Sequence, residues 1–135
     1  MNSQPRAIRF WFDFSSPYSY IASEWLPALA ARHGRTVQWN AILLGATFQA
    51  TELKSPVAYP LKREYTLRDF ARSAHFEGVP FQQPDVFPIA TQNAARVFWW
   101  LHAQDPARAV AWARCALRAY FTRGVPLNDG TALKA

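Results

Sequence analysis

The stretch of residues 9–21, Arg-Phe-Trp-Phe-Asp-Phe-Ser-Ser-Pro-Tyr-Ser-Tyr-Ile, changes its apolar period halfway along. Residues 8–14 are aromatic and apolar apart from Arg9 and Asp13, as in a buried strand. Ser16 before Pro17 is a helix-start signal, because a serine hydroxyl caps free backbone N–H groups and a proline at the first helical position has no N–H to lose. Apolar residues then recur at helical spacing. The stretch predicts a buried strand that runs into a helix, with a hydroxyl at the junction.

The junction at Ser16 is a favourable place for a negative charge, because the positive end of the helix dipole points there. A thiolate, a phosphate or a carboxylate would fit this position. The alternative is that Ser16 only caps the helix, since capping serines are common. Asp13, three residues earlier, is interpreted as a buried polar group or a partner of nearby backbone and not as a catalytic residue.

A second strand is expected over residues 36–44, after a helix stop at Gly34. Strand, helix and strand at this spacing form a βαβ unit with parallel strands and a right-handed crossover. In the rest of the chain, the apolar spacing and the positions of proline and glycine predict a helical turn at 48–53, a helix at 60–76, a loop at 82–88 and two further helices at 91–102 and 106–123. Trp99 and Trp100 widen the apolar surface of the helix at 91–102, which is therefore expected to be buried on most sides.

Composition indicates one folded domain. The chain has 135 residues, of which 50% are hydrophobic, so a core can form without disulfides or metal. Cys115 is the single cysteine, which excludes an internal disulfide framework, and it is interpreted as a small core residue. The three histidines lack ligand-like spacing, so no metal site is expected.

The net charge of +6 comes from basic residues scattered along the chain. This pattern favours an arginine-rich surface over a nucleic-acid footprint, and a small anionic substrate would also suit it. For this reason we expect no nucleic-acid partner. We expect no membrane partner either, because no stretch approaches membrane-spanning length. A soluble cytoplasmic protein is the expectation.

Residues 12–20, Phe-Asp-Phe-Ser-Ser-Pro-Tyr-Ser-Tyr, resemble the opening of 2-hydroxychromene-2-carboxylate isomerases and kappa-class glutathione transferases, which belong to the DsbA-like branch of the thioredoxin fold. Stretches at 40–48, 62–72, 78–81 and 87–89 resemble this family in the same order. Thiol oxidoreductases of that branch carry Cys-x-x-Cys where this chain has Ser-Pro-Tyr-Ser at 16–19, so a disulfide oxidoreductase is not expected.

The resemblance implies an α/β fold: a thioredoxin-like (DsbA-like) βαβ unit at residues 1–45 with an all-helical insertion at 46–135. The family chains are longer, and their C-terminal thioredoxin half is expected to be absent from this chain. A two-stranded sheet leaves exposed edges, so we expect exposed apolar surface, dimerisation or a structure less settled than the family's, and a homodimer is the expected assembly.

The resemblance also implies a function, the glutathione-dependent isomerisation of an anionic aromatic-degradation intermediate, with Ser16 as the catalytic residue that stabilises the glutathione thiolate. The residues expected to bind glutathione or substrate are Ser16, Pro17, Tyr18, Lys62 and Asn40. The structural alternatives are an exposed lysine on an amphipathic helix for Lys62 and the end of a strand ladder for Asn40. Leu53 occupies the position at which the family has an asparagine that contacts glutathione. The alternative for the whole chain is an inactive family remnant that binds glutathione or a protein.

Overall fold

A computed structural model describes residues 6–134, so residues 1–5 and 135, at the ends of the two predicted domains, lie outside the described residues. The elements follow in the order β1 (Ile8–Phe12), α1 (Pro17–Arg32), β2 (Val37–Ala41), α2 (Leu44–Ala50), α3 (Pro60–Glu77), α4 (Gln92–Gln104) and α5 (Pro106–Arg123). Short 3₁₀ turns lie at Pro56–Ala58 and Ala132–Lys134.

The two strands form a parallel sheet in which Ile8 pairs with Val37 and Phe12 pairs with Ala41. This arrangement confirms the predicted βαβ unit. The second strand is shorter than predicted, because the N–H of Leu44 donates to the Asp13 carboxylate at 2.7 Å and begins α2. The prediction of strand to residue 44, and of a helical turn starting only at residue 48, was therefore wrong.

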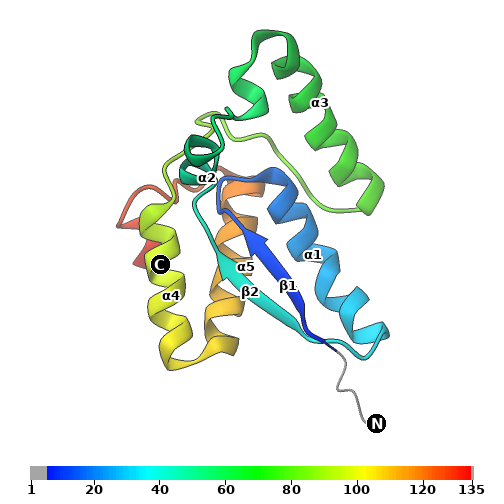
Figure 1. The fold of residues 1–135 in the computed structure, drawn as a ribbon, viewed down its shortest axis with the longest axis vertical. Helices are drawn as coiled ribbons and strands as arrows, with labels where there is room; N and C mark the ends of the chain where they lie inside the picture. Colours follow the sequence, from blue (N-terminus) through cyan, green and yellow to red (C-terminus); the bar gives the residue numbers. More distant parts are fainter. Residues whose placement is uncertain (1–5, 135) are drawn as a thin grey trace.

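One face of the sheet is buried in the core, and the other is exposed except at Asn40, which is 6% exposed. Phe10 and Phe12 of β1 and Trp39 of β2 point into the core, where their rings meet edge to face at centroid distances of 5.0 and 5.5 Å. Arg9, Trp11 and Gln38 have the opposite register and are exposed. In Figure 1, α5 lies behind the sheet, with α1 on one side and α4 on the other.

Helices α4 and α5 complete the core. The buried face of α4 is narrower than expected. Phe98 is fully buried, whereas Trp99 and Trp100 are 41% and 65% exposed. The expectation that α4 is buried on most sides was wrong, because an apolar run does not reveal that only one layer packs on the helix. Cys115 is also exposed and not a core residue, since the buried face of α5 is formed by Ala113, Leu117 and their neighbours in register.

The helix α3 extends away from the sheet (Figure 1). It begins at Pro60 and ends at Glu77, and its C-cap Gly78 has the left-handed conformation (φ 66°) that a glycine adopts without steric cost. Its buried face consists of Thr66, Phe70 and Ala74, one turn apart from each other. Phe70 is the member of this face that reaches the functional site.

Candidate functional site

The N-terminus of α1 is formed as the sequence predicts. Ser16 has an extended backbone, its Oγ accepts a hydrogen bond from the N–H of Ser19 at 3.1 Å, and Pro17 occupies the first helical position. The cap bond uses a lone pair of Ser16 and leaves its O–H proton free. Within residues 6–134 no acceptor lies in hydrogen-bond distance of that proton, so the half-buried hydroxyl can donate to a ligand.

A second donor stands beside this hydroxyl. The first N–H groups of a helix have no acceptor within the helix. Here Pro17 has no N–H, the N–H of Ser19 is capped, and the N–H of Tyr20 donates to the Ser16 carbonyl at 3.0 Å. The N–H of Tyr18 therefore remains as the helix donor without a partner in the described part of the chain. Together with the Ser16 hydroxyl it can hold one anion at the positive end of the helix dipole.

Asp13 organises the backbone around this donor pair. The carboxylate is 5% exposed, and its two oxygens accept from the N–H of Ser15 at 2.8 Å, the hydroxyl of Thr91 at 2.9 Å and the N–H of Leu44 at 2.7 Å. A buried carboxylate is stable only with such partners. The interpretation of Asp13 as a buried partner of nearby backbone is confirmed.

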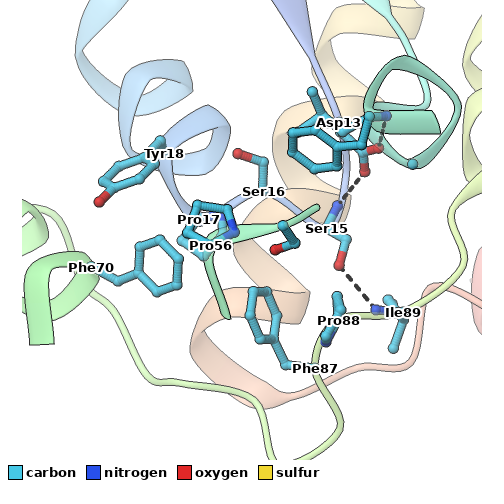
Figure 2. Close-up of a pocket in the computed structure, with 14 residues that line it drawn as sticks. Asp13, Ser15, Ser16, Pro17, Tyr18, Pro56, Phe70, Phe87, Pro88 and Ile89 are labelled. Atoms are coloured by element: carbon cyan, nitrogen blue, oxygen red, sulfur yellow. Dashed lines mark hydrogen bonds between the residues drawn. The ribbon is translucent and has the colours of Figure 1, made fainter. Parts of the chain in front are cut away.

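A cavity of 390 Å³ opens at the α1 N-terminus. Asp13 is the one charged side chain among its lining residues, and the remaining walls are mainly aromatic and aliphatic. In Figure 2, Asp13 and Ser15 lie on one side of this cavity, and Tyr18 and Phe70 lie on the other. The lining residues are Asp13, Ser15, Ser16, Pro17, Tyr18, Leu44, Gly45, Phe48, Ser55, Pro56, Phe70, Phe87, Pro88 and Ile89.

Tyr18 connects α1 to α3. Its hydroxyl donates to the carboxylate of Asp69, and its ring packs edge to face on Phe70 at 4.9 Å. Partial burial, followed by the hydrogen bond to Asp69, raises the pKa of Tyr18, so its hydroxyl stays protonated at neutral pH. Tyr18 is thus a wall of the cavity and not a source of negative charge.

The structure brings together three of the five sequence-predicted site residues, Ser16, Pro17 and Tyr18. Asn40 is buried in β2 and its amide donates to the carbonyl of Gln38 at 3.0 Å. Lys62 is exposed at the start of α3, with its ammonium 4.9 Å from the centre of the Tyr59 ring. Neither Asn40 nor Lys62 is among the residues that line the cavity.

Sequence reasoning assigned no site role to Ser15, Phe70 or Phe87, although all three line the cavity. Phe70 lies in the predicted helix at 60–76 and in the stretch 62–72 that resembles the family. The stretch at 87–89 stood out only through the family resemblance, because a loop has no periodicity to interpret. The described residues contain no group of three or more histidine, cysteine or acidic side chains placed to hold a metal. No helix in the same range is long and apolar enough to cross a membrane.

A parallel βαβ unit whose crossover helix begins at a serine cap, packed with further helices, is the arrangement of a thioredoxin-like protein, and this sequence has a single cysteine and so no redox cysteine pair. Residues 7–135 match the family described as DSBA-like thioredoxin domain. The chain belongs to this family.

Within this family, the chain is similar to isomerases and to kappa-class glutathione transferases. A 2-hydroxychromene-2-carboxylate isomerase of Pseudomonas putida is 33% identical over 123 residues, which are 87% of this chain and 57% of that protein. Glutathione S-transferase kappa 1 of Caenorhabditis elegans is 32% identical over 84% of this chain and 53% of its own length. A solved 2-hydroxychromene-2-carboxylate isomerase superimposes with a TM-score of 0.79 at 26% identity, over 93% of this chain and 61% of that one. The chain therefore spans a little more than half the length of these relatives.

Proposed function

We propose that this chain forms the glutathione-binding part of a glutathione-dependent isomerase of the 2-hydroxychromene-2-carboxylate type. The observation that carries the proposal is the pair of donors at the start of α1, the Ser16 hydroxyl and the Tyr18 N–H, which have no partner among residues 6–134 and belong to residues that line an apolar cavity. The isomerases and kappa transferases named above support it. An anionic aromatic substrate and a cytoplasmic location belong to the same proposal.

The donor set fits a thiolate. Hydrogen bonds and a helix N-terminus both favour the charged form of a thiol and lower its pKa. The apolar walls limit the water that would otherwise compete for these donors. Glutathione would supply a thiolate that adds to the conjugated substrate, permits bond rotation and leaves again, with no net redox change. In this scheme Ser16 and the Tyr18 N–H hold the sulfur, while Phe70 and Phe87 contact the substrate ring.

Lys62 and Asn40 remain proposed contacts to the peptide part of glutathione. Their positions outside the cavity lining favour a second candidate, a chain that binds glutathione weakly and catalyses nothing. With Asp13 as the one charged lining residue, the cavity itself offers no cation to the glutathione carboxylates. A homodimer is also proposed, with the exposed Trp99 and Trp100 of α4 as its contact surface.

Calorimetric titration with glutathione tests the proposal on the unmodified chain and on Ser16→Ala. We expect binding by the unmodified chain and a loss of about 1.5–3 kcal/mol in the variant, the contribution of a hydrogen bond to a charged group. Turnover of 2-hydroxychromene-2-carboxylate then separates the two candidates. Binding without turnover favours the inactive chain, and no binding at millimolar glutathione contradicts both.

A further inference from the structure

The segment of residues 86–91 is a wall of the cavity that contains no helix or strand, yet it is fixed to the α1 turn. The N–H of Ile89 donates to the hydroxyl oxygen of Ser15 at 3.0 Å, and the hydroxyl of Thr91 donates to Asp13 at 2.9 Å. Both bonds join residues more than seventy positions apart in the chain. They fix where Ile89 stands relative to the start of α1.

The start of the same segment is attached to α5. The buried hydroxyl of Tyr120 donates to the carbonyl of Val86 at 2.8 Å. Hydrogen bonds at Val86, Ile89 and Thr91 thus hold this segment, and Phe87, Pro88 and Ile89 line the cavity (Figure 2).

Thr91 is used in an unusual way for its position. It is the N-cap residue of α4, where a threonine hydroxyl normally accepts from the first helical N–H groups. Its side chain makes no cap bond and donates to Asp13 instead, and the residue is 4% exposed. The same Asp13 oxygen accepts from the N–H of Ser15, next to Ser16. One carboxylate oxygen therefore joins the apolar wall to the thiolate-holding turn.

We propose that Thr91, acting through Asp13, is a positioning residue that sets the wall of Phe87 and Ile89 relative to Ser16 and so determines affinity for a planar aromatic ligand. The inference rests on the proposed function for what that ligand is, the second substrate. Affinity for glutathione should not depend on Thr91, because the cap bond between Ser16 and the N–H of Ser19 holds the sulfur donors in place at the start of α1.

The test compares the unmodified chain with Thr91→Val, which keeps the shape and loses the O–H, and with Thr91→Ser, which keeps the O–H. The probes are 1-naphthoate, a planar aromatic carboxylate, and glutathione, each titrated separately by calorimetry. Thr122→Val is the matched control, because the Thr122 hydroxyl donates to the Arg118 carbonyl of its own helix, α5.

We expect Thr91→Val to weaken naphthoate binding about tenfold, which corresponds to about 1.4 kcal/mol, with glutathione affinity unchanged. Thr91→Ser restores naphthoate binding, and Thr122→Val changes neither ligand. Equal losses for both ligands in Thr91→Val, an unchanged naphthoate affinity, or no naphthoate binding by the unmodified chain would each overturn the inference. If Thr91→Val does not fold, Thr91→Ala decides, since it also removes the O–H that donates to Asp13 and must weaken naphthoate selectively.

Failure of the proposed function has a different signature. An unmodified chain that binds naphthoate and not glutathione contradicts the glutathione proposal, and the naphthoate comparison of the Thr91 variants still decides the role of Thr91.

Discussion

The N-termini of α1 and α5 are built alike and differ in what they face. Each helix begins with a capping side chain followed by proline, Ser16-Pro17 in α1 and Asp105-Pro106 in α5. At α1 the cap accepts one N–H, the Tyr18 N–H has no partner among residues 6–134, and the turn lines a 390 Å³ cavity. At α5 the Asp105 carboxylate accepts two N–H groups, from Ala107 and Arg108, and the residue is exposed. The same local structure is a candidate anion site in one place and a closed cap in the other.

The donors left unpaired at a helix N-terminus, and their surroundings, distinguish a candidate anion site from a closed helix cap. A carboxylate cap carries its own negative charge and uses the helix donors itself. A serine cap is neutral and leaves a proton to donate. The cavity walls beside Ser16 are mainly apolar, whereas Asp105 is exposed to solvent.

Exchanging the two caps should have the largest effect. Ser16→Asp preserves capping but places a carboxylate where the thiolate would lie, and two negative charges about 4 Å apart repel by about 4 kcal/mol at an effective dielectric constant of 20. We expect glutathione affinity to fall more than about a hundredfold while the thermal midpoint stays within a few degrees. Asp105→Ser, the matched exchange, should leave affinity unchanged. Tight binding by Ser16→Asp would show that the sulfur lies elsewhere.

Alkaline pH should lower the free energy of unfolding through Tyr120, whose hydroxyl holds the cavity wall at Val86. Burial raises the pKa of Tyr120 to about 12, although the nearby Ser15 hydroxyl lowers it in part. Above the unfolded pKa of about 10, the unfolded chain loses this proton and the folded chain keeps it. Its stabilisation is complete below pH 10 and is lost as pH rises towards 12, at up to about 1.4 kcal/mol per pH unit.

Urea unfolding between neutral pH and pH 11 measures this loss. Tyr120→Phe should show a shallower decline than the unmodified chain. Burial, followed by the charge of Glu24, also raises the pKa of Tyr20 to about 12, so part of the decline remains in the variant. An identical decline in both proteins would mean that Tyr120 does not titrate as a buried group.

Removing either cap side chain should have the smallest effect on stability. The comparison separates two roles of Ser16, capping the helix and binding the glutathione sulfur. Ser16→Ala and Asp105→Ala should each destabilise the fold by about 1 kcal/mol, as N-cap deletions do. Only Ser16→Ala should weaken glutathione binding. Chemical unfolding and calorimetry on both variants check this, and equal losses of affinity would mean that Ser16 acts only through stability.

These helix starts could be predicted from the sequence because they depend on neighbouring residues alone. Ser16 was found in this way, as were the βαβ unit and the helices beginning at Pro60 and Pro106. The wall around Phe87 and the bond from Thr91 to Asp13 could not be, because their partners lie more than seventy residues away. Burial on α4 and at Cys115 was mispredicted for a related reason. Hydrophobicity does not specify how many layers pack around a helix.

The pKa of the glutathione thiol in its complex with this chain is the measurement that tests the central claim most directly. Ultraviolet absorbance of the thiolate across a pH titration gives this value for the unmodified chain, Ser16→Ala and Asp105→Ala. We predict that the bound thiol ionises at least about one unit below the ordinary thiol value of about 8.5, that Ser16→Ala reverses most of this shift, and that Asp105→Ala leaves it intact. A bound thiol that titrates like a free one, or a shift that survives Ser16→Ala unchanged, would contradict the account.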